Sequence, residues 1–201
     1  MTKKNDALAE LIAALKTLPS VGVKSAQRMA YHLLQHDREG AGRIVTTLQN
    51  ALKQIIHCRL CNTLCEHEIC HLCSDEKRDH SRLMIVHMPS DVISMESANC
   101  HDGLYFVLMG YIDPTQNRDI HSTGLEKLLD RIETGEITEI IIATNFTAEG
   151  NATAHILYEA LKNYPCKISR LSQGMPLGSE LEYIDSGTLA QAVYERKCLK
   201  N

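Results

Sequence analysis

Four cysteines arranged as two Cys-x-x-Cys pairs, Cys58–Cys61 and Cys70–Cys73, constrain this chain more than any other feature. Eight residues separate the pairs, so both can reach one tetrahedral metal ion from a short knuckle. Four thiolates at this spacing favour zinc, and a site closed by four protein ligands leaves no open position for water. The pattern therefore predicts a four-cysteine zinc finger with one structural zinc ion per chain. The alternatives are a redox-active pair or buried thiols without metal. Further possible ligands in the same stretch are His57, Cys65, His67 and His71.

The bulk composition excludes several classes of protein. A chain of 201 residues can bury one substantial core and a small appendage. It is too long and too helical for a secreted disulfide scaffold, although it has eight cysteines. The opening MTKKNDALAE is polar where a signal peptide needs an apolar run, and no apolar stretch approaches the about 18 residues of a membrane span. We therefore expect a cytoplasmic protein whose cysteines bind zinc.

Charge is distributed unevenly along the chain, although the whole carries only −4. Residues 1–57 hold eight lysines and arginines against four acidic residues, which leaves about +4 there and about −8 in the remainder. A basic region joined to an acidic body suits a protein that touches a polyanion with one end. The alternative is a set of charges that are merely solvated.

Three helical patterns precede the cysteines. The first stops at Pro19, a turn containing Gly22 follows, and the third ends near Cys58. We expect their apolar stripes to form a core. The stripes are Leu8, Leu11, Ile12, Leu15 and Leu18; Ala26, Met29, Ala30, Leu33 and Leu34; and Ile44, Val45, Leu48, Leu52 and Ile55.

After the cysteines, short apolar runs alternate with helical patterns. The runs over 83–86, 105–109, 140–143 and 168–171 predict strands, and the segments 124–132, 152–161 and 189–196 predict helices. This alternation predicts a mostly parallel sheet with helices on both faces.

The turn between the first two helical patterns is a candidate phosphate-binding site. A helix stopped by proline, a tight turn and a second helix describe a helix–hairpin–helix, whose turn amides lack internal partners. We expect Ser20 and Gly22 to present amides to a DNA phosphate, and Lys24, Ser25 and Arg28 to reinforce the contact. The alternative is a plain helical corner with a satisfied turn.

A second candidate site lies at the carboxyl end of the third predicted strand, where open α/β sheets bind ligands. Asn145 and Glu149 lie in the loop there, and the next helix is expected to begin near Asn151. His87 follows the first predicted strand, and Asp91 is the nearest acid after it, so the carboxylate pair needed for two-metal chemistry is incomplete. For Glu149 a helix cap or a partner contact is the favoured role.

The loop 171–185 has glycines, a proline and clustered acids, and it lacks the GxxxxGK[ST] pattern of a phosphate-binding loop. A contact with a protein partner or a metal is more typical of such a loop than a contact with nucleic acid. From its chemistry alone both remain open.

The motifs LKTLPSVGVKSAQRMAYHLL, the two cysteine pairs, ATNFTAEGNATA and QGMPLGSELEYIDSGTL together resemble the bacterial RecR family of recombination mediators over essentially the whole chain. The resemblance implies an α+β multidomain fold. Its parts are a helix–hairpin–helix DNA-binding region over 1–57, a C4-type zinc finger over 58–73, an α/β Toprim domain with a parallel sheet over 81–176, and a C-terminal oligomerisation segment over 177–201.

The resemblance also implies a function. Members of the family form dimers and tetrameric rings and act with RecO, and in many bacteria with RecF, to load RecA onto gapped single-stranded DNA, without an established catalytic activity. We therefore expect a non-enzymatic DNA repair mediator in the cytoplasm, associated with the nucleoid. Its rivals are a magnesium-dependent Toprim nuclease or phosphotransferase that uses Glu149, and a pure assembly scaffold.

The chain departs from the family pattern at three positions. Ser20 replaces a glycine of the hairpin, Phe146 replaces a proline, and His87 replaces the acid that follows the first strand. The last change weakens a magnesium site and favours the non-enzymatic interpretation.

Overall fold

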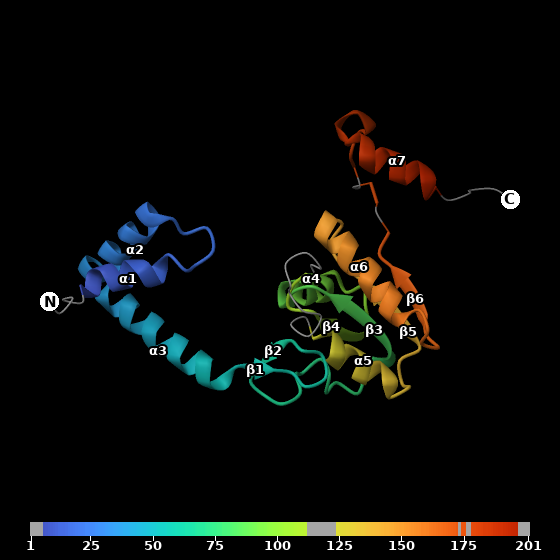
Figure 1. The fold of residues 1–201 in the computed structure, drawn as a ribbon, viewed down its shortest axis with the longest axis horizontal. Coiled ribbons are helices and arrows are strands. Elements are labelled where there is room, and N and C mark those ends of the chain that lie inside the picture. The colour runs from blue at the N-terminus through green and yellow to red at the C-terminus, as the bar shows by residue number, and fades with distance from the viewer. Residues whose placement is uncertain (1–5, 112–123, 173, 176–177, 197–201) are drawn as a thin grey trace. The chain divides into compact units, whose positions relative to one another are not determined.

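A computed structural model describes residues 6–111, 124–172, 174–175 and 178–196 (Figure 1). The chain divides into two compact units, Met1–Ile55 and Ile56–Asn201. Each unit is described by itself. Residues 173, 176–177 and 197–201, which belong to the predicted acidic loop and C-terminal segment, lie outside the described residues. No helix of the described part is long and apolar enough to cross a membrane.

The N-terminal unit consists of the helices α1 (Ala7–Leu15), α2 (Val23–Gln35) and α3 (Arg38–Gln54). Asp6 and Asp37 cap α1 and α3, because their carboxylates accept hydrogen bonds from backbone amides of the first turn. Ala26 and Ala30 of α2 are fully buried, and such small side chains allow helices to approach closely. The two predicted helices around the turn are therefore present.

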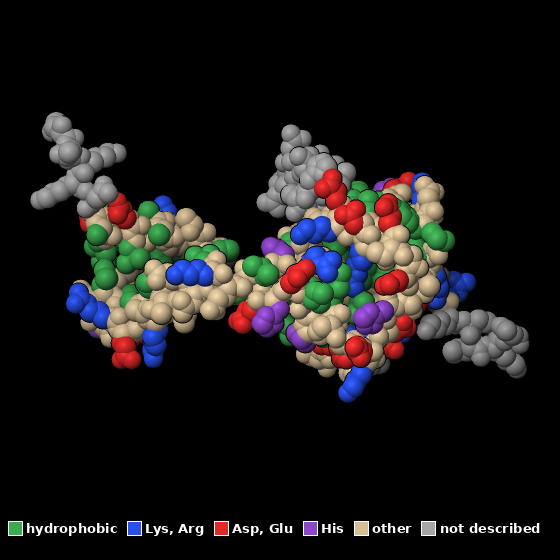
Figure 2. Space-filling view, turned by 90° about the horizontal axis from the view of Figure 1, so that it is seen from below, with side chains coloured by type: hydrophobic (Ala, Val, Ile, Leu, Met, Phe, Trp, Pro, Cys, Tyr) green, Lys and Arg blue, Asp and Glu red, His purple; other side chains and the backbone are tan. Residues whose placement is uncertain are grey.

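The prediction of a core from the third apolar stripe is wrong. Ile44, Val45, Leu48 and Leu52 expose between 54% and 76% of their surface, and Ile55 is exposed as well. Gly40, in the first turn, is the only buried residue of α3. Beyond that turn no residue of the stripe is buried within the N-terminal unit. Met29, Leu34 and Leu18, also expected in the core, are exposed. Figure 2 shows hydrophobic side chains at the surface of this unit.

The second unit begins with the cysteine knuckle, in which β1 (Ile56–His57) and β2 (Leu64–Cys65) pair antiparallel. A four-stranded sheet follows, with the strands β3 (Asp79–Val86), β4 (Gly103–Val107), β5 (Glu139–Ile142) and β6 (Lys167–Arg170). Their spatial order is β4-β3-β5-β6, and all three pairings are parallel. The four predicted strands and the parallel sheet are confirmed.

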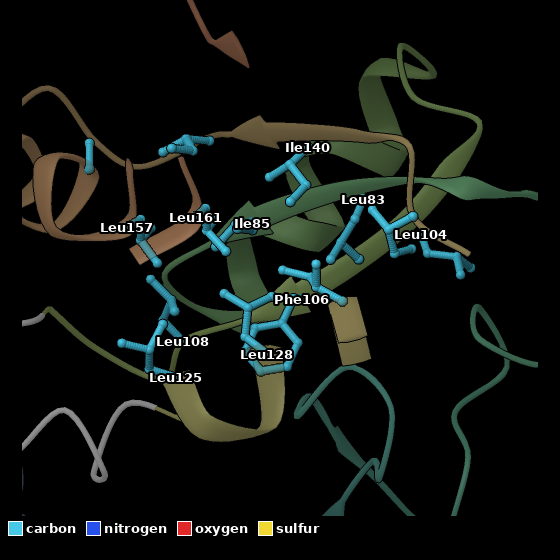
Figure 3. Packing of buried hydrophobic residues seen from close by; sticks show 14 residues of the cluster. Leu83, Ile85, Leu104, Phe106, Leu108, Leu125, Leu128, Ile140, Leu157 and Leu161 are labelled. Carbon is cyan, nitrogen blue, oxygen red and sulfur yellow. The ribbon is translucent and has the colours of Figure 1, made fainter. Parts of the chain in front are cut away.

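Helices cover both faces of this sheet, as predicted. On one face α5 (Leu125–Glu133) and α6 (Ala148–Leu161) bury Leu128, Leu157 and Leu161 against Phe106 and Ile140 (Figure 3). On the other face α4 (Pro89–Ala98) contributes Val92 to a smaller cluster. That cluster also contains Met84, Val86, Tyr105, Val107 and Ala143. Alternate residues of β3 and β4 thus enter opposite cores.

Some boundaries differ from the predicted ones. The helix expected near Asn151 begins at Ala148, because the Thr147 hydroxyl accepts a hydrogen bond from the Gly150 amide and caps it three residues earlier. The sequence analysis missed α4 altogether. The predicted final helix is α7 (Ser186–Tyr194), preceded by the 3₁₀ turn η2 (Leu181–Tyr183). This segment buries no residue and exposes Leu181, Tyr183, Val193 and Tyr194.

Candidate metal centre and nucleic-acid interface

The four predicted ligands converge. The Sγ atoms of Cys58, Cys61, Cys70 and Cys73 all lie within 4.8 Å of one another, and each residue is at most 5% exposed. The Sγ atoms of Cys61 and Cys70 are 3.4 Å apart. Four thiols that share one buried point, without a disulfide, have the donor set and the closeness that a tetrahedral thiolate site requires. The cluster is compatible with a metal site.

Backbone turns within the knuckle position the ligands. The Asn62 amide donates to the Cys58 carbonyl at 2.9 Å, and the Ser74 amide donates to the Cys70 carbonyl at 3.1 Å. Each Cys-x-x-Cys pair is therefore wound into one helical turn that brings its two thiols to the same side. The Cys70 amide also donates to the Cys58 Sγ at 3.3 Å, a contact that stabilises a negatively charged thiolate.

Hydrogen bonding among the thiols favours ionisation at one of them. Contacts with the thiols of Cys61 and Cys73 lower the pKa of Cys70 from its ordinary value, and burial opposes this effect. Thiolate is the form that binds a metal. Two of the four spare groups are occupied otherwise: Cys65 Sγ donates to the His67 carbonyl at 2.9 Å, and His57 Nδ1 contacts the Asn62 carbonyl at 2.9 Å. The structure thus favours the four predicted cysteines as the ligand set.

The knuckle is attached to the sheet by residues that the sequence analysis missed. Asn62 adopts a left-handed φ of 62°, and its buried side chain donates to the Val107 carbonyl at 2.8 Å. The Val107 amide donates to the Cys61 carbonyl at 2.8 Å, so the first cysteine turn extends the edge of β4. Arg131 of α5 donates to the carbonyls of Leu60 and Tyr105. An asparagine inside a cysteine turn, which tolerates left-handed backbone, was the one sequence signal for this arrangement.

The hairpin between α1 and α2 has a tight backbone. Thr17 Oγ1 donates to the Ala14 carbonyl at 2.7 Å, and the Val21 amide donates to the Leu18 carbonyl at 3.2 Å. Ser20 has a left-handed φ of 64°, a conformation that glycine adopts without steric cost and other residues adopt at about 1–2 kcal/mol. Ser20 therefore adopts in this turn the backbone conformation that a glycine would favour.

The N-terminus of α2 is uncapped. Gly22 occupies the N-cap position with φ −82° and provides no side-chain hydrogen bond. A Cβ atom at Gly22 would meet nothing within 4 Å, so sterics within this unit do not require a glycine there. The first amides of a helix have no intrahelical acceptor and carry the positive end of its dipole. Bare amides at this end are a geometry that binds anions.

The predicted basic side chains lie next to these amides. Lys24, Ser25 and Arg28 occupy the first two turns of α2, and all three are exposed. No acidic side chain of the described residues forms an ion pair with Lys24 or Arg28. The structure therefore brings the five predicted DNA-contacting residues to one turn and the start of one helix. Their contact with DNA stays a prediction.

At the carboxyl edge of the sheet, the structure brings His87 and Asn145 together. The Asn145 amide donates to His87 Nδ1 at 3.4 Å, and the Asn145 side chain donates to the Tyr111 hydroxyl at 3.0 Å. The rings of His87 and Tyr111 lie 4.2 Å apart between centroids. Burial lowers the pKa of His87, opposed by the nearby Asp91. A neutral imidazole, rather than a carboxylate, thus fills the end of β3.

The two acids expected at this edge have separate environments. Asp91 Oδ2 accepts a hydrogen bond from the Met88 amide at 2.8 Å and so caps the N-terminus of α4. Glu149 is exposed in the first turn of α6, and its carboxylate forms no hydrogen bond or ion pair with another described residue. Within the described ranges, the four cysteines are the only group of three or more His, Cys, Asp or Glu side chains close enough to hold a metal ion.

Comparisons with known proteins cover nearly all of this chain. Family models match residues 8–52 (RecR, helix-hairpin-helix), 81–172 (Toprim domain) and 174–197 (RecR, C-terminal). A protein of Neisseria meningitidis named Recombination protein RecR is 63% identical over 198 residues, covering 98% of this chain and 96% of its own. The proteins of the same name from Neisseria gonorrhoeae and Chromobacterium violaceum are 62% and 54% identical, and each alignment covers at least 97% of both chains.

Proposed function

The chain belongs to the RecR family of recombination proteins, and from this premise we propose that it is a DNA-binding recombination and repair mediator that acts by binding and assembly. The observation that carries the proposal is the uncapped N-terminus of α2, flanked by Lys24 and Arg28 without acidic partners. Amides and cations so placed bind phosphate groups without reading the base sequence. A protein that acts at gaps in any sequence needs contacts of this kind.

The metal of the cysteine cluster is one zinc ion per chain in this proposal, held by Cys58, Cys61, Cys70 and Cys73. When bound, the ion would cross-link the knuckle. It would have no catalytic role, since the four thiolates occupy all tetrahedral positions. The hydrogen bonds of Asn62 and Arg131 transmit this rigidity to β4 and α5.

We further propose that the protein catalyses no reaction. Phosphoryl transfer with magnesium uses carboxylates that converge on the metal. Here Asp91 caps α4, and a buried neutral His87 stands at the end of β3. The expected result with magnesium is no DNA cleavage by the wild type; cleavage that the Glu149→Gln variant lacks would instead support a nuclease.

Exposed apolar side chains in both units support assembly into a homodimer or a tetrameric ring. The exposed side chains are the stripe of α3 (Ile44, Val45, Leu48, Leu52 and Ile55) and the C-terminal Leu181, Tyr183, Val193 and Tyr194, and gathered apolar surface of this kind marks interaction sites. In an assembly, several copies of the hairpin act on one DNA molecule, which multiplies weak contacts through effective concentration.

As a member of this family, the protein is proposed to act with RecO, and with RecF where present, to load RecA onto gapped single-stranded DNA. With such partners, the proposed location is the cytoplasm, at the nucleoid. The exposed Asn145 and Glu149 at the sheet edge are the proposed partner contact, since neither is buried in the fold.

The site is tested by duplex-DNA binding over a salt series. The Lys24→Ala/Arg28→Ala variant should bind more weakly than the wild type, and its slope of log K against log salt should fall by about 1.8, because each lost phosphate contact removes about 0.9. The control Arg43→Ala/Lys53→Ala removes the same charge from α3 and should leave most of the slope intact. An unchanged affinity and slope in the first variant would refute the proposed site.

A further inference from the structure

The face of α2 that follows the hairpin carries a row of cationic and imidazole side chains. Lys24, Arg28, His32 and His36 recur every four residues, so they lie along one side of the helix. All four are exposed, and the rings of His32 and His36 lie 5.9 Å apart between centroids. At a rise of 1.5 Å per residue the row extends for about 18 Å. One strand of nucleic acid with stacked bases places about five phosphates along that length.

A shallow hollow of about 630 Å³ lies on the same face. The described residues that line it belong to α2 and its C-cap, namely Ser25, Arg28, Met29, Tyr31, His32 and His36. The lining thus combines cationic or hydrogen-bonding groups with an aromatic ring and a thioether. Tyr31 and Met29 expose 46% and 41% of their surface, although both are apolar over most of their side chain.

Three of the four acids described in this unit are engaged elsewhere, and the fourth, Glu10, lies in the first turn of α1. Asp6 and Asp37 accept hydrogen bonds from the first-turn amides of α1 and α3. Glu39 forms an ion pair with Arg43 on α3. No acidic side chain lines the hollow, so its charge favours an anionic occupant.

The exposed aromatic ring distinguishes between two forms of DNA. In a duplex, both faces of each base are covered by neighbouring base pairs, so an aromatic side chain on a helix surface finds no free base face to stack on. In a single strand the bases are free to stack on aromatic rings beside a cationic track. Tyr31 lies three residues after Arg28, on the adjacent side of the row, where a base attached to a bound phosphate can reach it.

We propose that this face of α2 binds single-stranded DNA, with phosphates along Lys24, Arg28, His32 and His36 and one base stacked on Tyr31. An imidazole contributes whether charged or neutral, because one ring nitrogen carries a proton to donate in either state. This inference rests on the proposed function, since the hairpin and the row share Lys24 and Arg28. It adds the strand form that the site prefers.

The test compares the affinity of the full-length protein for a labelled oligothymidine strand and for a duplex of equal length. Tyr31→Ala should weaken single-strand binding by about 5- to 150-fold, the range measured for lost base–aromatic stacking, and leave duplex binding nearly unchanged. Tyr31→Phe keeps the ring and should retain wild-type affinity for both. Tyr158→Ala, which removes a similarly exposed tyrosine from α6, is the matched control and should change neither.

Two results would overturn the inference. One is an unchanged single-strand affinity of Tyr31→Ala, and the other is an equal loss for strand and duplex. If that equal loss comes with a change of oligomeric mass, this face is assigned to a contact with a second copy. If Lys24→Ala/Arg28→Ala weakens duplex binding in any of these cases, the proposed function stands and only the stacking site fails.

Discussion

Arg78 and Glu96 form the best-enclosed ion pair of the described residues. Two guanidinium nitrogens of Arg78 donate to the two carboxylate oxygens of Glu96 at 2.9 and 2.7 Å, and Tyr105 donates to the same carboxylate at 2.6 Å. The hydrogen bonds from Arg78 hold the pKa of Glu96 below its ordinary value, and burial opposes them. This network connects the segment after the knuckle with α4 and β4.

Replacing Glu96 by glutamine should lower the free energy of unfolding by about 2 kcal/mol at pH 7, because Arg78 then loses its charged partner. A carboxylate with a depressed pKa stabilises the fold above its unfolded pKa, and that contribution disappears as the pH falls through the folded pKa. Urea unfolding should therefore show the two proteins converging between about pH 5 and pH 3.

The control for this prediction is Glu159→Gln, which breaks the exposed pair between Glu159 and Lys162. An exposed pair contributes about 0–1 kcal/mol to stability. The free energy of unfolding of this variant should therefore be close to that of the wild type at pH 7 and at acidic pH. Equal stabilities of wild type and Glu96→Gln at pH 7 would contradict the role given to the Arg78 network.

Single residues differ in how well the sequence predicts their surroundings. The four ligands could be predicted because their spacing limits them to one point in space. Asn62 and Arg131 could not, because each acts on a carbonyl more than 40 residues away, at Val107 or Leu60. His87 was placed correctly at the end of a strand, but its ring contact with Tyr111 depends on the tertiary fold.

Among the helices, α2 begins at an N-cap residue, Gly22, that provides no side-chain hydrogen bond. Its first-turn amides are therefore free to bind an anion. The variant Gly22→Asp supplies a carboxylate that accepts from the first-turn amides and complements the helix dipole. It should raise the free energy of unfolding by a few tenths to about 1 kcal/mol, since aspartate is a better N-cap than glycine.

The same variant should bind duplex DNA more weakly, because its carboxylate occupies the anion site. Chemical unfolding and fluorescence anisotropy measure the two effects. Gly42→Asp adds the same charge to α3, where a Cβ also meets nothing within 4 Å, and controls for simple repulsion. A higher free energy of unfolding together with an unchanged affinity for duplex DNA would show that phosphate does not bind at the start of α2.

The exposed stripe of α3 is predicted to be an interface between copies of the chain. Leu48→Lys/Leu52→Lys should reduce the molar mass in solution, measured by light scattering, because two charges enter an apolar contact. Thr46→Lys/Asn50→Lys, on other positions of the same helix, should leave the mass unchanged. An unaltered mass in the leucine variant would exclude the stripe as the interface.

The stripe of α3 also shows what the period of apolar residues cannot predict. A helical period of apolar residues identifies a face that avoids water, and it does not identify what covers that face. In α5 and α6 the sheet covers it, and Leu128, Leu157 and Leu161 are buried there. In α3 no other described part of its own unit does. The missed helix α4 had local signals, Pro89 in the first turn and Asp91 as a capping acid, which outweigh its weak apolar period.

For the molecule as a whole, the parallel sheet was predictable because strand and helix patterns alternate and each run is long enough to be buried. The strand order β4-β3-β5-β6 was not, since it depends on which crossovers pass over which face. The attachment of the knuckle to β4 could not be predicted from the sequence either. It makes the cysteine cluster an extension of the sheet edge.

Metal removal should therefore act on the second unit as a whole. A chelator added in the absence of denaturant should release about one zinc ion per chain. The melting temperature of residues 56–201 should then fall, because the buried thiols lose the metal ion that they share. Cys58→Ser should behave like the chelated protein, and Cys100→Ser, at an exposed cysteine outside the cluster, should behave like the wild type. A zinc content far below one per chain would contradict the four-thiolate site.

The central claim, mediation by binding and assembly, is tested most directly by the rate of RecA filament formation on gapped DNA coated with single-strand-binding protein, in the presence of RecO. The wild type should accelerate filament formation without cutting the DNA, and Lys24→Ala/Arg28→Ala should lose the acceleration while keeping the wild-type fold. An equal acceleration by both proteins, or none by the wild type, would contradict the account.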